Sequence, residues 1–294
     1  AGSKANQSAT LMAAGAEAIA KMIESVGTSG RFTRESILEA HHTLLAQDEI
    51  EACFAGKFRD VQNWVGGSNY SPYLADYIPP PPELVETYMD DLIAFLNRDD
   101  IPAVAQAAIG HAQFESIHPF TDGNGRIGRA VINAVFRRRG VSRRVLTPVA
   151  SSLVANQKRY FKTLIDYRAG QIDDLILNLA LAAQVSGREA LVSAINIETM
   201  PTAWLAAARP RAGSAAERII NLLVTHPVLS AELAERLLGA SSQSIYEAMD
   251  ALERAGVVHE LTNRQRNKVW GATAVLAELE SLNLRIAHSV SRLY

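Results

Sequence analysis

One stretch carries most of the information in this sequence: Ile117-His-Pro-Phe-Thr-Asp-Gly-Asn-Gly-Arg-Ile-Gly-Arg129. It joins two predicted helices, which cover residues 102–117 and 125–139. Pro119 ends the first of them because proline disfavours the helical conformation in the residue before it. The glycines that follow let the backbone curl. The N–H groups at the start of the second helix can therefore converge on an anion.

The polar side chains of this stretch suit phosphate chemistry. Arg126 and Arg129 are three residues apart, so both lie on one face of the first helical turn. Two guanidinium groups there would bind a polyphosphate. Asp122 offers the hard oxygen that Mg²⁺ prefers, and His118 is a proton acceptor near neutral pH. Together they predict transfer of a phosphate-containing group to a hydroxyl.

Two other interpretations of these residues are disfavoured. Residues 123–128 have the form GxGxxG, but the dinucleotide fingerprint needs a preceding strand and an acid about 20 residues on. Here a helix precedes, and no acid occurs between Arg129 and Asp166. His111, Glu115 and His118 share a helix face and could resemble a metal triad, but the HExxH spacing is absent. A structural role is favoured for the first two.

The same residues resemble a known family. From His118 to Arg129 the chain matches in full the Fic-family signature His-x-Phe-x-Asp-Gly-Asn-Gly-Arg-x-x-Arg. Eight fixed positions would coincide by chance on the order of 10⁻¹⁰ per start site. Residues 56–67, 76–83, 89–97 and 111–115 also look like the larger bacterial Fic proteins, in which a C-terminal winged helix is a frequent companion. The similarity covers roughly residues 30–190.

The resemblance implies an activity. Fic enzymes typically transfer AMP from ATP to a Ser, Thr or Tyr hydroxyl of a target protein and release pyrophosphate. His118 would be the general base, and Phe120 would anchor the loop in the core. The other expected roles are Mg²⁺ binding by Asp122, an anion hole of Gly123, Asn124 and Gly125, and binding of the outer phosphates by Arg126 and Arg129. Positioning and charge neutralisation would supply most of the catalysis.

Other functions remain open. Transfer of UMP, phosphate or phosphocholine, or removal of AMP, would use the same loop residues. A DNA-binding regulator whose Fic core senses nucleotide is a non-enzymatic alternative. The intact His118 argues against it, because sensing needs no general base.

The segment 61–80 is expected to form a small β-hairpin flap, with strands at 61–65 and 75–78. The family resemblance suggests that its edge pairs with the main chain of the target. Its candidate docking residues are Gly66, Gly67, Tyr77 and Ile78. Tyr160 and Tyr167 are candidate adenine contacts, and they are equally consistent with core aromatics.

Regulation is where the chain departs from the family pattern. Many Fic proteins carry an inhibitory Ser/Thr-x-x-x-Glu-Gly/Asn element, whose Glu would pair here with Arg129. No Glu in this chain is followed by Gly or Asn. The element lies upstream of Ala1, is supplied by a partner, or is absent, and a truncated chain is the preferred interpretation. The chain as given is therefore expected to lack autoinhibition.

Composition bounds the remaining possibilities. The 294 residues suggest about two domains. A net charge of −2 excludes a globally basic nucleic-acid binder. The single cysteine, Cys53, excludes an intrachain disulfide and any multi-cysteine metal site, which fits a cytoplasmic protein. No apolar run reaches about 18 residues, so no membrane span is expected.

The predicted architecture is mostly α: a Fic-fold helical core with the hairpin flap, followed by a winged helix-turn-helix domain. The expected divisions are an N-terminal helical segment 1–29, the core 30–195, a linker 196–213 with Pro201, Pro210 and Gly213, the winged helix 214–275 and a terminal helix 276–294. The terminal helix is amphipathic. It is compatible with a homodimer or with packing inside the chain.

Two charged regions bear on partners. Residues 214–275 hold seven acids and six Lys/Arg, and the predicted recognition helix 241–255 is acidic. That is a poor footprint for DNA, so protein interaction or dimerisation is favoured. Possible DNA contacts are Ser241, Ser242, Gln243, Arg264, Arg266 and Lys268. The arginines at 137, 138, 139, 143 and 144 are predicted to be a solvated helix end rather than a nucleic-acid patch.

Overall fold

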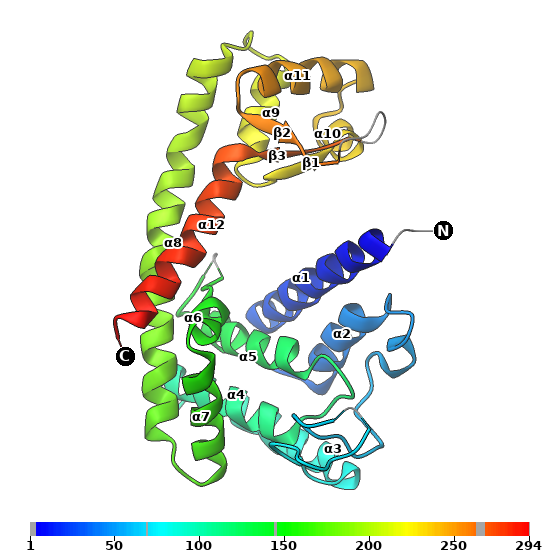
Figure 1. Cartoon of the computed structure of the whole chain (residues 1–294), viewed down its shortest axis with the longest axis vertical. Helices are drawn as coiled ribbons and strands as arrows, with labels where there is room; N and C mark the ends of the chain where they lie inside the picture. The colour runs from blue at the N-terminus through cyan, green and yellow to red at the C-terminus, as the bar shows by residue number, and fades with distance from the viewer. Residues whose placement is uncertain (1–3, 69, 144–145, 263–267, 294) are drawn as a thin grey trace. The chain divides into compact units, whose positions relative to one another are not determined.

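The computed structural model describes residues 4–68, 70–143, 146–262 and 268–293 (Figure 1). The chain divides into two compact units, one ending at Ala183 and the other beginning at Gln184. The division falls inside the long helix α8 (Asp173–Ala208), which contributes residues to both units.

The first unit is helical. Its elements are α1 (Lys4–Ser29), α2 (Arg34–Leu45), a short 3₁₀ turn η1 (Ala52–Phe54), α3 (Pro82–Leu96), α4 (Ala103–Ile117), α5 (Asn124–Arg138), α6 (Val149–Ala155) and α7 (Gln157–Arg168). The helices predicted on either side of the 117–129 stretch are thus α4 and α5. Helices α6 and α7 are separated by Asn156, whose side chain caps α7 by accepting the Arg159 N–H.

Helix α2 begins at a capped N-terminus. Thr33 accepts a hydrogen bond from the backbone N–H of Ser36, and the Ser36 hydroxyl accepts one from the Thr33 N–H. This reciprocal arrangement is a capping box, and an N-cap of this kind stabilises a helix by about 1 kcal/mol.

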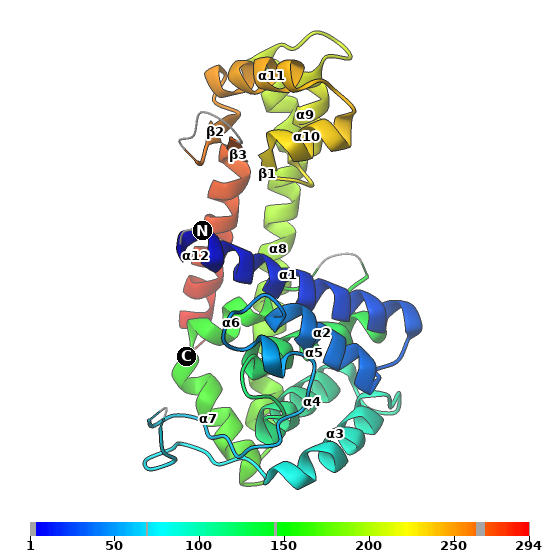
Figure 2. The same cartoon turned by 90° about the vertical axis from the view of Figure 1, so that its right-hand side faces the viewer.

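Helix α5 lies at the centre of the first unit, where both views place it among α1, α2 and α4 (Figures 1 and 2). Ile127, Val131 and Val135 repeat every four residues along it and are fully buried. Burying each such side chain stabilises the fold by roughly 1.5–3 kcal/mol. The N-terminus of α5, which carries the glycine-rich turn, is therefore held by a packed core.

The predicted β-hairpin at 61–80 is wrong in its extent. Among the described residues of this segment, only two isolated bridges form, Val65 with Tyr77 and Ser68 with Ser71. The sequence prevents a longer ladder, because Gly66 and Gly67 both have φ near +70° and turn the chain out of the extended conformation. The prolines at 72 and 79–82 also lack the N–H that a ladder needs.

The second unit combines helices with one small sheet. After α8 come α9 (Ala215–Leu223), β1 (Val228–Ser230), α10 (Ala231–Leu238), α11 (Ser242–Arg254), β2 (Val258–Glu260), β3 (Val269–Ala272) and α12 (Thr273–Ser291). The strands form an antiparallel sheet in the order β1-β3-β2. Trp270 of β3 is opposite Leu229 on one side and Glu260 on the other, and its side chain is fully buried.

Three expectations from the sequence are corrected in this unit. Residues 196–208 are helical, so only the segment after Ala208 remains of the predicted linker. Pro201 is tolerated inside α8 because the helix there packs Trp204 into the core of the second unit. Strand β1 has no counterpart among the predicted elements, since three residues between two helices give no alternating pattern. Helix α12 begins at Thr273, directly after β3.

Helix α8 also bears on the expectation of no membrane span. An 18-residue window of this helix has a mean hydropathy of 1.3, so its length and composition alone would let it cross a bilayer. The core helix of a water-soluble protein passes the same test. The expectation therefore stays a prediction.

Helix α12 packs within its own unit. Arg285 pairs with Glu189 of α8 at 3.2 Å and with Glu278 of α12 at 2.7 Å. Ile286 and Val290 of α12 are buried. This packing accounts for part of the amphipathic pattern without a second copy of the chain.

Candidate functional site

The 117–129 stretch forms a tight loop between α4 and α5, bounded by two residues in the left-handed conformation. His118 caps the C-terminus of α4 with φ 50° and ψ 60°, and Gly123 caps the N-terminus of α5 with φ 79°. A histidine in this region is uncommon, and such strained residues cluster at functional sites. The turn at His118 redirects the chain where the imidazole leaves the helix.

Asn124 and Phe120 hold the loop from within. The Asn124 amide accepts a hydrogen bond from Phe120 N–H at 2.9 Å and donates one to Phe120 C=O at 2.7 Å. The Phe120 ring is fully buried and contacts the rings of Phe58 and Phe114. Phe120 is thus buried in the core, as predicted. The Asn124 side chain is thus engaged by the loop itself.

His41 of α2 holds the loop from outside, and sequence reasoning did not identify it. Its Nδ1 accepts the Gly56 N–H at 3.0 Å, so Nε2 carries the proton and donates to Asp122 C=O at 3.1 Å. Burial lowers its pKa to about 4, so the ring stays neutral. Its position on the buried face of α2 was the one available signal, and that signal predicts only a core residue.

Arg59 is a second residue that the sequence did not reveal. Its side chain is buried and donates to the carbonyls of His118 (2.9 Å), Val61 (3.1 Å), Pro80 (2.6 Å) and Ile117 (3.3 Å). Two of these carbonyls close the C-terminal end of α4, where helical carbonyls lack partners. Arg59 therefore ties both ends of the flap segment to the turn at His118.

The His118 imidazole is held at one nitrogen. Nδ1 lies 3.0 Å from Asn63 Nδ2 and 3.2 Å from Asn124 Nδ2. Both amides are oriented by the Phe120 carbonyl, so Nδ1 accepts and the ring proton sits on Nε2. Burial, followed by the nearby Arg59 and Arg168, lowers the pKa of His118 to about 4. The ring is therefore neutral at pH 7.

Asp122 and Arg126 form an ion pair of 2.7 Å at the mouth of the loop. The Asp122 side chain is 53% exposed and that of Arg126 38%, so the pair contributes at most about 1 kcal/mol and can exchange partners. Among the described residues, no three His, Cys, Asp or Glu side chains are grouped to hold a metal. A single exposed carboxylate fits Mg²⁺ only when phosphate oxygens complete its shell.

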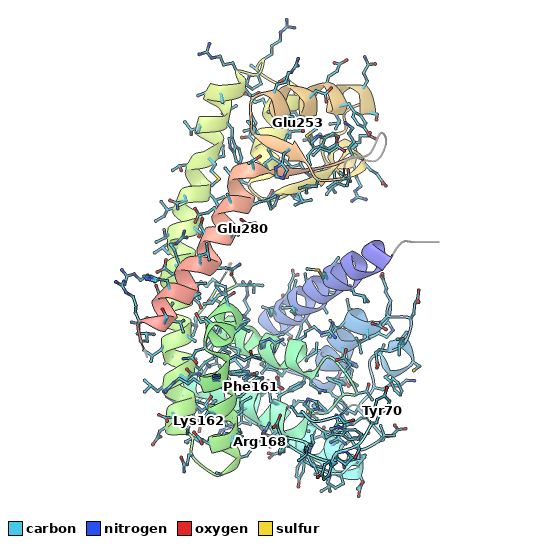
Figure 3. The ribbon with its side chains drawn as sticks, in the orientation of Figure 1. Tyr70, Phe161, Lys162, Arg168, Glu253 and Glu280 are labelled. Carbon is cyan, nitrogen blue, oxygen red and sulfur yellow. The ribbon has the colours of Figure 1, made fainter. Side chains whose placement is uncertain are left out.

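A cavity of about 610 Å³ opens beside the loop. The residues that line it come from the flap (Val65, Gly66, Asp76, Tyr77), from α4 and α5 with their loop (Glu115, His118, Gly125, Arg129), and from α6 and α7 (Val154, Gln157, Tyr160, Phe161, Leu164, Ile165, Arg168). Figure 3 shows Phe161 and Arg168 on α7. The volume and the apolar α7 wall suit a small organic ligand.

The structure thus sorts the predicted site residues. The cavity is lined by His118, Gly125, Arg129, Gly66, Tyr77 and Tyr160. Gly123, Asn124, Asp122 and Arg126 lie at the adjoining turn and first turn of α5. Ile78 is exposed and Gly67 follows Gly66 in the flap, but neither lines the cavity. Tyr167 does not line it either, since its hydroxyl donates to Gln113 at 2.7 Å.

His111 and Tyr160 form a buried hydrogen-bonded pair next to the cavity. His111 Nδ1–H donates to Gly128 C=O at 2.8 Å, so its Nε2 accepts the Tyr160 hydroxyl proton at 2.9 Å. Both His111 nitrogens are therefore used, which excludes the metal-triad interpretation and supports the structural role. Burial lowers the pKa of His111 to about 4 and raises that of Tyr160.

Tyr77 anchors the flap above this site. Its hydroxyl donates to Ser116 C=O at 2.8 Å, and the Arg168 guanidinium lies 3.5 Å above its ring centroid. Cation–π contacts of this kind contribute about 0.5–2 kcal/mol. A Cβ on Gly66 would meet the Asp76 carboxylate, and the φ of +77° at this position is one that glycine adopts without strain.

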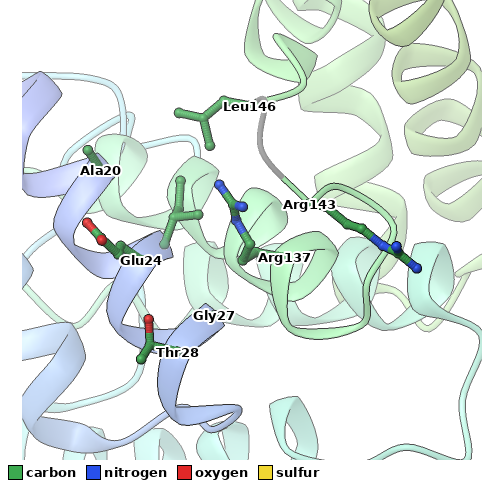
Figure 4. A pocket seen from close by; sticks show the side chains of 8 residues that line it. Ala20, Glu24, Gly27, Thr28, Arg137, Arg143 and Leu146 are labelled. Carbon is green, nitrogen blue, oxygen red and sulfur yellow. The ribbon is translucent and has the colours of Figure 1, made fainter.

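The arginine-rich end of α5 is mostly structural. Arg138 donates to Asn97 C=O at 2.7 Å and pairs with Asp99, and Arg139 donates to Ile101 C=O and to Gln106. Arg137 and Arg143 line a separate pocket of about 450 Å³ beside α1 (Figure 4). Arg144 lies outside the described residues.

Part of this chain is similar to known proteins. Residues 31–136 match the family model described as the Fic/DOC family. Protein adenylyltransferase fic-1 of Caenorhabditis briggsae is 36% identical over 110 residues, which are 36% of this chain and 19% of that protein. A probable protein adenylyltransferase of Aquifex aeolicus is 36% identical over 99 residues, 33% of this chain and 28% of that protein. The match thus spans less than a third of either relative.

One solved structure resembles nearly the whole chain. The crystal structure of a Fic family protein from Desulfovibrio desulfuricans covers 92% of this chain and 76% of its own, with a TM-score of 0.51 and 17% identity. At that identity the likeness shows the fold alone, a mostly helical Fic fold with a small three-stranded antiparallel sheet near the C-terminus. The part of the chain that matches the Fic/DOC family model, residues 31–136, includes the whole 117–129 loop.

Proposed function

We propose that this chain is a protein adenylyltransferase that moves AMP from ATP to a Ser, Thr or Tyr hydroxyl of a target protein and releases pyrophosphate. The observation that carries the proposal is that His118, Gly125 and Arg129 line one cavity with the apolar α7 wall. A base, an anion site and a surface for a flat ring are thereby brought together. The relatives named adenylyltransferases support the same reaction.

The phosphates would bind at the N-terminus of α5. The N–H groups of Arg126 and Ile127 already bond to Gly123 C=O. The N–H groups of Asn124 and Gly125 have no acceptor among the described residues. They are therefore available to an anion at the positive end of the helix. Arg126 and Arg129 then take the outer phosphates, and Arg126 leaves Asp122 to do so. Asp122 would hold Mg²⁺, whose charge neutralises the phosphates when it is bound.

His118 would accept the proton of the target hydroxyl at Nε2. The freed oxygen attacks the α-phosphorus, the bond from that phosphorus to the bridging oxygen breaks, and pyrophosphate leaves with the electron pair. In the ligand-free chain Nε2 carries the ring proton, so this role requires the proton to move to Nδ1 first. The amide groups of Asn63 and Asn124 must then both turn away from Nδ1, and Asn63 links this change to the flap segment.

The base of the nucleotide would lie on the α7 wall. Phe161 and Ile165 are about half exposed on it, although both are apolar. Tyr160 lines the same cavity, so it stays a candidate adenine contact, whereas Tyr167 does not line it and its hydroxyl donates to Gln113. The flap, with Tyr70 and Tyr73 exposed, would receive the target main chain.

Intact-mass spectrometry after incubation with ATP and Mg²⁺ tests the proposal, because enzymes of this type often modify themselves. The expected gain is one AMP in the native chain and none in His118→Ala. His288→Ala, a surface histidine on α12, is the matched control and should behave as the native chain. A gain of phosphate alone, or a gain of UMP from UTP, would point to another Fic reaction. An equal gain in His118→Ala would overturn the role of His118.

The second unit has its own proposed role. Its order of helix, strand, two helices and two strands supports a winged helix-turn-helix, with α11 as recognition helix. On α11, Gln243 bonds to Glu247, and the acidic Asp250 and Glu253 follow. Lys268 of the wing is paired with Glu260 at 2.9 Å. Arg264 and Arg266 lie outside the described residues. This charge pattern favours a protein surface, including a second copy of the chain, over DNA.

Two measurements distinguish these partners. Light scattering is expected to show self-association of the native chain. If α11 is the interface, replacing Tyr246 and Glu247 by alanine abolishes this self-association. An electrophoretic shift with duplex DNA is expected to show no salt-sensitive binding. Salt-sensitive binding with a slope of several ions would instead support the DNA-binding regulator.

A further inference from the structure

Glu115 is a buried carboxyl that the proposed reaction does not use. It lies in the last turn of α4, three residues before His118, and both side chains line the cavity. The residue is 9% exposed, and its Oε1 has no hydrogen-bond partner among the described residues. An unsatisfied buried acceptor is costly, and native proteins rarely retain one without a function.

The neighbours of Glu115 do not satisfy it. Tyr160 lines the same cavity and carries a hydroxyl donor, but it donates that proton to His111. Arg129 and Arg168 are near enough to oppose the rise in its pKa, which burial brings to about 7. Yet in the part of the chain that the structure describes, neither arginine forms an ion pair with it within 4.0 Å. A Cβ on Gly128 would collide with Oε1, so a glycine in α5 leaves the room that this carboxyl occupies.

We propose that Glu115 contacts the bound nucleotide, accepting a hydrogen bond from its nucleoside part. This inference rests on the proposed function, since it presumes that the cavity binds a nucleotide. Phosphate groups at neutral pH offer acceptors almost exclusively, so an ionised carboxylate finds donors only on the nucleoside. Those donors are the ribose hydroxyls and the N–H groups of the base. Glu115 would thereby select a ligand that presents such a donor to its carboxylate.

The apolar wall strengthens this assignment. Val154, Phe161 and Ile165 offer a surface to a flat ring but no hydrogen bond. Specificity in such a site comes from a few polar groups, and a site that loses one partner of a buried hydrogen bond discriminates strongly. Glu115 is the acidic residue of α4 that lines the cavity, and Arg168 also lines it.

The test is a set of double-mutant cycles between the protein and the ligand. Isothermal calorimetry would measure binding of ATP, 2′-deoxy-ATP, 3′-deoxy-ATP and purine riboside triphosphate, which lacks the 6-amino group. The proteins are His118→Ala, which prevents turnover, and the same chain with Glu115→Gln added. Measurements at pH 8 keep the carboxyl ionised. Asp91→Asn, the same chemical change at an exposed position of α3, is the control.

Glu115→Gln is expected to weaken ATP binding about 10- to 100-fold, because a hydrogen bond to a charged group is lost. One analogue should bind more weakly than ATP by the same factor when Glu115 is present, and as well as ATP to the Glu115→Gln variant. The analogue that does so identifies the donor as a ribose hydroxyl or the amino group of the base. Asp91→Asn should leave every affinity unchanged.

Two results would overturn the inference. Every ligand, inorganic tripolyphosphate included, would lose the same factor if Glu115 merely orients Arg129 or Arg168. No ligand would lose affinity if a water satisfies Oε1. If ATP binds with the expected coupling but the mass experiment shows no transfer, the inference stands and the proposed function fails. If ATP does not bind at all, both fail.

Discussion

The imidazole of His41 stacks on the ring of Phe120, with centroids 3.7 Å apart and planes 6° apart. The two residues are separated by almost 80 positions, and one belongs to α2 while the other belongs to the loop that carries His118. The stack and the bond from His41 Nε2 to Asp122 C=O fix both the apolar and the polar side of that loop. The loop geometry is therefore set by α2 as well as by its own glycines.

His41→Leu should destabilise the chain by about 2–4 kcal/mol. The substitution keeps an apolar side chain under Phe120 but leaves Gly56 N–H and Asp122 C=O without partners. Urea unfolding measures the change. His42→Leu is the control, because His42 is the exposed neighbour on the same helix, and it should lie within about 0.5 kcal/mol of the native chain. Equal effects of the two substitutions would contradict the role assigned to His41.

Arg59→Met should cost about 3–5 kcal/mol and disorder the turn at His118. The buried guanidinium donates to four carbonyls, and the substitution removes all of these donors while keeping the aliphatic volume. Arg34→Met removes a surface arginine paired with Glu86 and Asp90, and should cost no more than about 1 kcal/mol. Denaturant midpoints for the two variants decide the matter, and similar values would argue against a clamp at Arg59.

Gly128→Ala should destabilise the first unit by about 1–3 kcal/mol and weaken ATP binding. Its Cβ would collide with the Glu115 carboxylate and lie 3.1 Å from the Phe114 ring, which the packed α4–α5 contact cannot absorb. Gly187→Ala in α8 meets nothing within 4 Å, so it should stabilise its helix by up to about 1 kcal/mol. Thermal unfolding compares the two variants. A neutral Gly128→Ala would show that α4 and α5 can separate.

Acid should destabilise the chain between about pH 6.5 and 4. His41, His111 and His118 have pKa values lowered to about 4, so the unfolded chain binds their protons first and native stability falls as the pH drops through this range. Glu115, with a pKa raised to about 7, acts in the opposite direction, since its native form binds a proton first. The unfolded chain thus binds three histidine protons and the native chain one carboxyl proton. The free energy of unfolding therefore changes by about 2.7 kcal/mol per pH unit.

Glu115→Gln provides the check on that balance. Removing the opposing carboxyl should steepen the slope to about 4 kcal/mol per pH unit near pH 5.5. Urea unfolding at several pH values measures both slopes. An unchanged slope in the variant would mean that Glu115 titrates normally in the native chain.

Local spacing alone determined a good part of this protein. The helices on either side of residues 117–129, the break at Pro119 and the capping box at Thr33 follow from contacts three or four residues apart, which a sequence displays directly. The candidate phosphate residues Arg126 and Arg129 belong to the same class, because one helical turn places them together. The motif therefore predicts the family resemblance, and the local spacing predicts the centre of the candidate site.

Tertiary structure decided what surrounds that centre. His41, Arg59 and Asn63 reach the loop from 55 or more residues away, and no periodicity in the sequence links them to it. The same holds for the apolar wall of α7, for the short flap, for strand β1 and for the helix that replaces the linker. Such contacts depend on which surfaces meet when the helices pack. The reactive side chains of the loop can thus be read from the sequence. The protonation of the loop, its support by distant residues and the unpartnered Glu115 beside it arise only from burial.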